Sequence, residues 1–469
     1  MAARSSLNLT LYRQANFNLI VFLLTYCLLN IVIKIDCRQE SDACTQDVLD
    51  RSFVTKCDSN YCEPVIEHAT NDDWPSSTNT VVQIQSTRQG DRFKMIKHQS
   101  IDTSEYFYEE SHVNGTIFVD TKTRYQRILG FGTTLTDSSC TNVDDLPDDI
   151  RNKLIRDYFS TDDGIGLNLI KVPIGSTKYS YSNYALDQSD LSQVELSPYD
   201  IDYRIPLIRE AQKAAGRYKN RIKIIASSLT APQSYKQNNK LSEGGRLKTD
   251  RFDNYASYLN SFVRAFKEKD LNTWALIIGE NSASAIRIQR SNITRLDYSS
   301  MSMSPMEVIE LIQSISKARE RQTNQIDRYR LLILGDNRSN IPNWSNAIFD
   351  NPQVKDKVAG IAYTCDLDDF APYDNLEYSI KRYPTKYLLA CQSSSHTPVK
   401  LGNWQYAEDY ATEIVKNLAF GSVGWIDFNM ALDLSGGPSI NSHYTGKFDY
   451  RYRFLLLEKQ SLISPIIII

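Results

Sequence analysis

Short apolar runs alternate with amphipathic segments along most of the chain, which predicts alternating strands and helices. The apolar runs, typical of buried strands, begin at Ile128, Gly166, Arg221, Thr273, Arg330, Val358, Tyr387 and Val423. Between them, segments such as IPLIREAQKAA and FDNYASYLNSFVRAFKEK repeat their apolar positions at intervals of three and four. Eight such units over roughly 300 residues match the size of a (β/α)₈ TIM barrel. A doubly wound open sheet is the rival, but no glycine-rich phosphate loop follows any strand.

A different pattern precedes the barrel. From Thr80 to Thr121 the runs TVVQIQST, DRFKMIK and GTIFVDTK alternate apolar and polar residues between turn formers. This period of two predicts a small antiparallel β domain. We therefore expect a Cys-containing segment with β strands over residues 37–121 and the barrel over residues 122–432.

The first residues predict entry into the secretory pathway. An apolar segment from Asn18 to Ile35 follows Arg4 and Arg13, and residues 1–36 are expected to form a cleaved signal peptide or a signal anchor. Four cysteines crowd after it and predict disulfides, with a zinc site as the alternative: Cys37, Cys44, Cys57 and Cys62. N-glycosylation sequons stand at Asn114, Asn292, Asn337 and Asn343.

Charge and motifs exclude several functions. Lys and Arg number 53 against 56 Asp and Glu, a formal charge of −3, which offers no positive field for a nucleic-acid backbone. HExxH, GxSxG and Walker motifs are all absent from the sequence, so metalloprotease, serine hydrolase and P-loop chemistry have no support.

In a TIM barrel the functional side chains come from the carboxyl ends of the strands. The polar residues at these ends are Thr136, Asp137, Lys171, Ser228, Glu280, Asn281, Ser282, Asp336, Asn337, Asp366, Gln392 and Asp427. The structural alternative for each Asp is a helix N-cap. Position alone therefore nominates a set of candidates without choosing among them.

Several phrases in order resemble one family. YQRILGFGTTLTD, YFSTDDGIGLNLIKVPIGS, STRQGDRFKM, CDSNYC and VGWIDFNMAL are similar to the glucosylceramidase (glucocerebrosidase) family of retaining glycoside hydrolases, from about Cys44 to the C-terminus. The resemblance implies a lysosomal β-glucosidase of sphingolipid metabolism, acting on glucosylceramide. It implies a saposin-type activator and a membrane surface as partners, and neither a cofactor nor a metal.

The two catalytic carboxylates of the family are substituted here. Retaining enzymes need an acid/base and a nucleophile, roughly 5 Å apart. The resemblance places the acid/base at Ser282, or at Asn281 in a gapless alignment, and the nucleophile at Gln392. An amide can hold a sugar hydroxyl but is not an anionic nucleophile. Glu280 is a possible substitute acid, although two residues along a strand displace it by roughly 6.6 Å.

Other positions of the family's sugar pocket also differ. The resemblance puts Leu229 and Phe428 where the family has tryptophans and keeps Asp137 and Asn281 as sugar ligands. It further implies early truncation, with residues 433–469 as a remnant of a C-terminal β region. We therefore expect an inactive or weakly active homologue that binds glycolipid or an activator. The alternatives are an active retaining β-glucosidase and a truncation product without function.

Overall fold

The computed structural model describes residues 80–87, 94–99, 120, 122–162, 164–187, 193–280, 282, 298–320, 329–365, 371–391, 404–427 and 429–431. The expected signal segment, the four N-terminal cysteines and residues 432–469 lie outside these residues. The chain divides into two compact units, of which one contains strands β1 and β2 and the other contains the barrel strands.

Strands β1 (Thr80–Gln85) and β2 (Lys94–Gln99) form a two-stranded antiparallel sheet in which Thr80 lies opposite Gln99. The alternation of apolar and polar residues predicted this sheet, and both strands are confirmed. The third expected strand, GTIFVDTK, falls almost wholly outside the described residues.

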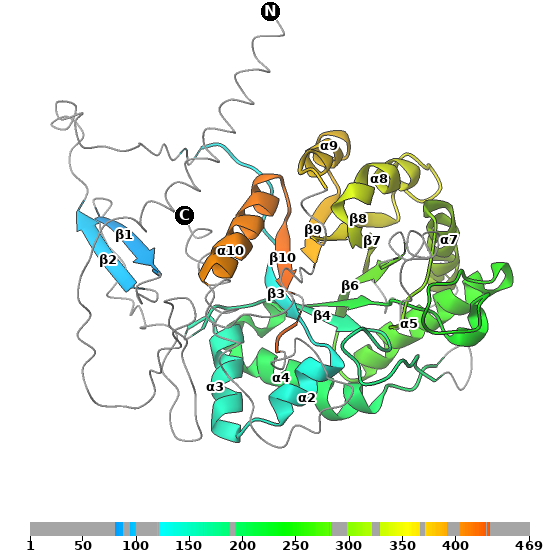
Figure 1. Ribbon diagram of the computed structural model, residues 1–469, viewed down its shortest axis with the longest axis horizontal. Coiled ribbons are helices and arrows are strands. Elements are labelled where there is room, and N and C mark those ends of the chain that lie inside the picture. Colours follow the sequence, from blue (N-terminus) through cyan, green and yellow to red (C-terminus); the bar gives the residue numbers. More distant parts are fainter. Residues whose placement is uncertain are drawn as a thin grey trace, which may run out of the picture. The chain divides into compact units, whose positions relative to one another are not determined.

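Eight parallel strands close into a barrel in the order of the sequence (Figure 1). They are β3 (Gly130–Thr134), β4 (Leu169–Pro173), β5 (Lys223–Ser227), β6 (Thr273–Ile278), β7 (Arg330–Asn337), β8 (Val358–Thr364), β9 (Tyr387–Cys391) and β10 (Gly424–Asp427). The ring closes where Gly424 of β10 pairs with Gly130 of β3. The TIM barrel and all eight strands predicted from the apolar runs are confirmed.

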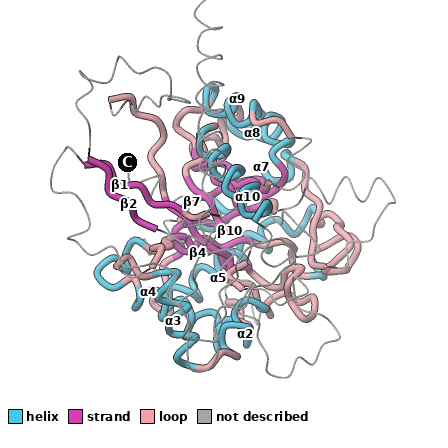
Figure 2. Tube along the Cα trace, turned by 60° about the vertical axis from the view of Figure 1, so that its left-hand side comes forward, coloured by secondary structure: helices cyan, strands magenta, loops and turns pink. Residues whose placement is uncertain are grey.

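Helices surround the barrel strands, which lie in the middle of the barrel in the view of Figure 2. The α-helices of the described residues are α2 (Asp137–Asp144), α3 (Asp148–Phe159), α4 (Ile205–Ala214), α5 (Phe252–Glu268), α7 (Pro305–Glu320), α8 (Ile341–Phe349), α9 (Asp374–Arg382) and α10 (Trp404–Ala419). In α5, buried residues recur every three or four positions, as at Tyr255, Leu259, Phe262 and Phe266. This spacing gives the helix one apolar face to bury. None of the helices in the described part of the chain is long and apolar enough to cross a bilayer.

Apolar side chains from successive strands fill the barrel interior. The buried cluster contains Leu169, Ile225, Ala275, Ile277, Leu332, Ala362, Leu389, Cys391, Val423 and Ile426. Because this core occupies the space between the strands, a ligand has to bind at the carboxyl ends.

Candidate active site

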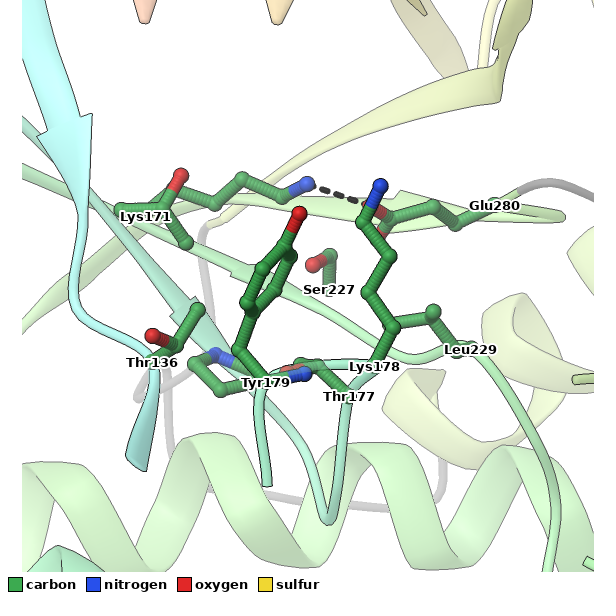
Figure 3. Close-up of a pocket in the computed structure, with 10 residues that line it drawn as sticks. Thr136, Lys171, Thr177, Lys178, Tyr179, Ser227, Leu229 and Glu280 are labelled. Atoms are coloured by element: carbon green, nitrogen blue, oxygen red, sulfur yellow. Dashed lines mark hydrogen bonds and ion pairs between the residues drawn. The ribbon is translucent and has the colours of Figure 1, made fainter. Parts of the chain in front are cut away.

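A pocket open to solvent lies at the carboxyl ends of β3, β4, β5 and β6 (Figure 3). Its lining residues are Thr134, Thr136, Lys171, Pro173, Thr177, Lys178, Tyr179, Ser227, Leu229 and Glu280. This is the edge where a TIM barrel carries its chemistry. Of the strand-end residues nominated from the sequence, Thr136, Lys171 and Glu280 line the pocket.

A buried ion pair spans the pocket. The ammonium of Lys171, on β4, donates to Oε1 of Glu280, which follows β6. The two side chains are only 4% and 2% exposed. A buried ion pair recovers the cost of desolvation only when the geometry is good and further hydrogen bonds are made.

Two polar atoms in the same pocket make no hydrogen bond to the described residues. They are Oε2 of Glu280 and Oγ of Ser227, both buried. Ser227 is the last residue of β5 and is 1% exposed. Buried polar groups are almost always hydrogen-bonded, and the described residues supply no partner for these two atoms.

Two glycines position Glu280 in the pocket. Gly279, directly before it, has φ +79, a left-handed conformation that turns the chain after β6. Gly335 has φ +53, and a Cβ built on it would lie 2.9 Å from the Cα of Glu280. A side chain at Gly335 would therefore collide with Glu280 and displace it.

The loop after β4 contributes residues that the sequence pattern did not nominate. Thr177, Lys178 and Tyr179 line the pocket, and in Figure 3 the side chains of Lys178 and Tyr179 extend toward the Lys171–Glu280 pair. Tyr179 is 9% exposed, whereas Lys178 lies on the exposed side with its Nζ 5.1 Å from the Tyr179 ring centroid. Such loop positions carry no periodicity that would have marked them.

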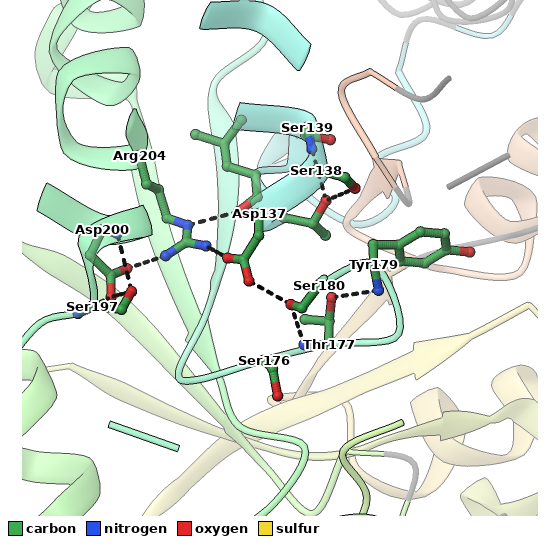
Figure 4. Close-up of polar contacts among 12 residues, drawn as sticks. Asp137, Ser138, Ser139, Ser176, Thr177, Tyr179, Ser180, Ser197, Asp200 and Arg204 are labelled. Atoms are coloured by element: carbon green, nitrogen blue, oxygen red, sulfur yellow. Dashed lines mark hydrogen bonds and ion pairs between the residues drawn. The ribbon is translucent and has the colours of Figure 1, made fainter. Parts of the chain in front are cut away.

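Asp137 is fully buried and does not line the pocket (Figure 4). Its carboxylate accepts from the guanidinium of Arg204, from Ser180 Oγ at 2.5 Å and from the Tyr184 hydroxyl at 3.0 Å. Burial raises the pKa of Asp137, while the charge of Arg204 opposes this. Because both carboxylate oxygens already accept hydrogen bonds, the sugar-binding role of Asp137 stays a prediction to which this geometry adds no support.

The remaining candidates fall into two groups. Ser282 is 1% exposed, and its hydroxyl donates to the Met301 carbonyl at 3.1 Å, while Leu229 lines the pocket. Gln392, Asn281 and Phe428 lie outside the described residues, so their roles stay predictions.

The glycosylation sites differ in exposure. The Asn337 side chain is 4% exposed and accepts from the Ser339 amide, so its glycosylation stays a prediction to which this geometry adds no support. Asn343 is exposed on α8. Asn114 and Asn292 are outside the described residues, as are Cys37, Cys44, Cys57 and Cys62. Among the described residues, no group of three or more His, Cys, Asp or Glu side chains could hold a metal ion.

Residues 128–448 match the glycosyl hydrolase family 30 TIM-barrel domain. The chain belongs to glycosyl hydrolase family 30. The lysosomal acid glucosylceramidase of Mus musculus is 28% identical over 409 residues, covering 83% of this chain and 74% of the mouse protein. These findings confirm the resemblance and make the chain a glucosylceramidase-like member of family 30.

Solved structures of other proteins share the barrel fold of this chain. An endo-β1,6-glucanase superposes with a TM-score of 0.61 at 20% identity, covering 72% of this chain and 76% of its own. SrfJ from Salmonella typhimurium superposes with a TM-score of 0.59 at 21% identity, and the match covers 71% of this chain and 74% of SrfJ. At such identities these likenesses establish the barrel of this family 30 chain and nothing about its substrate.

Proposed function

We propose that this family 30 chain is a glucosylceramide-binding homologue that has lost glycosidase activity. The observation that carries the proposal is the surroundings of Ser282, which the family resemblance aligns with the acid/base, with Asn281 as the alternative in a gapless alignment. The Ser282 hydroxyl is buried and donates to the Met301 carbonyl. A retaining glycosidase needs a carboxylic acid there to protonate the leaving oxygen. A serine whose proton is held by a carbonyl does not supply one.

Glu280 is a poor substitute for the missing acid. It forms a buried ion pair with Lys171, and an ion pair is made by the carboxylate, whereas a general acid must carry a proton. Releasing Glu280 for catalysis would also remove a counter-ion from the buried Lys171 ammonium, which is unfavourable. The pair therefore favours a binding role for Glu280.

The second catalytic role is vacant in the same sense. Gln392 stands at the nucleophile position by sequence, and an amide offers hydrogen bonds but no anion to form a glycosyl-enzyme. When both carboxylates are missing, the rate that remains comes from binding and orientation alone.

The proposal extends to the setting of the protein. We infer a place in glucosylceramide metabolism, in the secretory pathway, either lysosomal or extracellular, with a glycosphingolipid ligand. A saposin-type activator, a membrane surface, the signal peptide, the N-terminal disulfides and the domain bounds belong to the same proposal. The lysosomal name of the mouse relative and the apolar leader support it.

Hydrolysis of a fluorogenic β-glucoside at mildly acidic pH, by the purified secreted protein, tests the loss of activity. The double variant Ser282→Glu, Gln392→Glu restores both carboxyl groups. The matched control Ser282→Gln, Gln392→Glu has the same side-chain size at residue 282 without the acid. We expect no turnover by the natural chain or the control, and turnover by the restored variant.

Turnover by the natural chain would overturn the proposal in favour of an active retaining β-glucosidase. In that case Glu280→Gln decides whether Glu280 acts as the acid. Binding of butyl β-D-glucoside, measured by calorimetry, tests the other half of the proposal, because a natural chain that neither hydrolyses nor binds a glucoside has no glucosylceramidase-like function.

A further inference from the structure

Cationic side chains gather at the amino-terminal end of the barrel strands, the end opposite to the pocket. Lys223 begins β5 and is paired with Leu169 of β4. Arg330 begins β7 and is paired with Ala275 of β6. Leu169 and Ala275 belong to the apolar core inside the barrel. Because residues paired across two strands share one face of a sheet, Lys223 and Arg330 stand at the amino-terminal mouth of the barrel interior.

Two further arginines complete this group of cations. Burial lowers the pKa of the half-buried Lys223 ammonium, and the charges of Arg127, Arg330 and Arg221 lower it further. The three arginines are exposed. Since salt limits the reach of exposed charges to about 10 Å, the four side chains lie close enough together to meet a single ligand.

The described residues supply no counter-ion for these four side chains. None of Arg127, Arg221, Lys223 and Arg330 forms an ion pair with an Asp or Glu of the described residues, whereas another exposed cation, Arg246, is paired with a carboxylate. Like charges held together in this way repel one another. The cluster is therefore complementary to an anionic partner.

The cations border an apolar surface. The rings of Trp274 and Tyr387 are partly buried, pack against the barrel core and have their centroids 6.2 Å apart. The guanidinium of Arg330 stands over the Trp274 ring, 4.9 Å from its centroid, a favourable cation–π contact. The charged and aromatic side chains together form what we call the amino-end surface: Arg127, Arg221, Lys223, Trp274, Arg330 and Tyr387.

We propose that the amino-end surface docks an acidic segment of a partner protein. Several carboxylates along one extended segment can each meet a separate cation, and a guanidinium binds a carboxylate through two parallel hydrogen bonds. An apolar side chain of the same segment can pack on the Trp274 and Tyr387 rings between the charges. Because the amino-end surface and the pocket lie at opposite ends of the strands, such docking is independent of the proposed function.

The composition of the surface favours a polypeptide over two other anions. A free phosphate ion is small and would leave the Trp274 and Tyr387 rings unused. A lipid surface is bound by apolar side chains that enter the headgroup layer, whereas these two rings are held partly buried against the core. An acidic segment uses both the charges and the rings.

Fluorescence anisotropy of a fluorescein-labelled peptide, EEELEEE, titrated with the full-length secreted protein at low ionic strength, tests the proposal. The uncharged peptide QQQLQQQ has the same length and the same leucine. The variants are Arg127→Gln, Lys223→Met, Arg330→Gln and the three combined. Lys240→Gln is the matched control, because Lys240 is exposed, pairs with Glu243 and lies in the loop after β5, at the carboxyl end of the barrel.

We expect the natural chain to bind EEELEEE and not QQQLQQQ, with an affinity that falls as salt is added. Each single variant should weaken binding by about 3-fold and the triple variant by about 30-fold, as ion pairs near a surface do. Lys240→Gln should bind like the natural chain. Lys223→Met should melt at the same temperature as the natural chain or higher, because it relieves repulsion among the cations.

Four results would overturn the proposal. Equal binding of EEELEEE by the natural chain and the triple variant would place the peptide at another site. Binding of inorganic phosphate, or of phosphatidylserine–phosphatidylcholine vesicles, in a Lys223-dependent way without binding of the peptide would assign the surface to a different anion. Absence of binding to all these probes would leave it a solvated face. A lowered Tm of Lys223→Met would show that the fold itself already satisfies this ammonium.

Discussion

The guanidinium of Arg204 donates to the carboxylate of Asp137, and neither side chain is exposed to solvent. Arg204 also pairs with Asp200 and donates to the Leu135 carbonyl at 2.8 Å. This network joins the start of α2 to the start of α4, beside the loop that carries Lys178 and Tyr179 into the pocket. Asp137 thus acts on the pocket at a distance, by fixing the loop through Ser180 and Tyr184.

Replacing Arg204 by Met should strongly destabilise the barrel, because two buried carboxylates lose their counter-ion. We expect a loss of about 3–5 kcal/mol in the free energy of unfolding. The Arg246–Glu307 pair, in which the Arg246 side chain is 50% exposed, provides the control, as Arg246→Met should cost less than about 1 kcal/mol. Urea denaturation of the two variants measures the difference, and equal losses would contradict the structural role of Arg204.

A comparison of two glycines tests the closeness of the barrel strands. A Cβ on Gly132, in β3, would lie 1.9 Å from the Leu169 carbonyl oxygen of β4, whereas a Cβ on Gly216 meets nothing within 4 Å. Gly132→Ala should therefore break the β3–β4 pairing and prevent folding. Gly216→Ala should lose only about 1–2 kcal/mol of stability, because its φ of +55 is a left-handed conformation that alanine adopts with strain. Thermal melts should show a folded Gly216 variant with a lowered Tm, and a well-folded Gly132 variant would argue against this barrel packing.

The apolar runs predicted the barrel because a buried parallel strand needs nearly continuous apolar residues. Glu280 could be nominated as a polar residue that follows such a run, and Lys171 as the polar residue that interrupts another, within β4. It was harder to predict which residue at the end of β5 faces the pocket. Ser228 was nominated, yet its hydroxyl bonds the Thr230 carbonyl, and Ser227 lines the pocket. A shift of one residue along a strand decides which side chain faces the pocket.

Long-range partners could not be predicted from the sequence. Asp137 and Arg204 are 67 residues apart, and nothing local to either residue signals the other. The ion pair of Lys171 with Glu280 spans 109 residues. Pattern shows where a polar side chain stands, but whether its charge is already satisfied depends on tertiary contacts.

Lys236 should make the stability of the barrel depend on pH. Its ammonium is fully buried and donates to the Ser300 carbonyl at 2.6 Å and to the Leu241 carbonyl at 3.1 Å. Burial lowers the pKa of Lys236 to about 7. Between this value and the ordinary 10.5, the unfolded chain binds a proton that the folded chain has released, so stability rises with pH in that window and falls as pH drops toward 7.

Urea denaturation between pH 7 and pH 9 measures this slope. The free energy of unfolding of the natural chain should rise by about 1 kcal/mol per pH unit relative to that of Lys236→Met, which lacks the titrating group. Lys240→Met is the control in the same loop, because Lys240 is 50% exposed and its removal should leave the slope in place. A natural chain and a Lys236→Met variant with parallel pH profiles would show that Lys236 keeps its proton in the fold.

Restoring the acid at position 282 should itself make stability depend on pH. The Ser282 hydroxyl is buried and donates to the Met301 carbonyl. In Ser282→Glu, a protonated carboxyl can make the same donation, whereas an ionised one would face that carbonyl without a donor. Burial raises the pKa of such a carboxyl, so the variant should be most stable at acidic pH and lose stability as pH rises through that pKa. The Tm of Ser282→Glu should therefore fall between pH 5 and pH 7.5 relative to Ser282→Gln, whose amide does not titrate in that range. If the two variants melt in parallel, position 282 is open to water, and the restored acid should then be assayed at neutral as well as acidic pH.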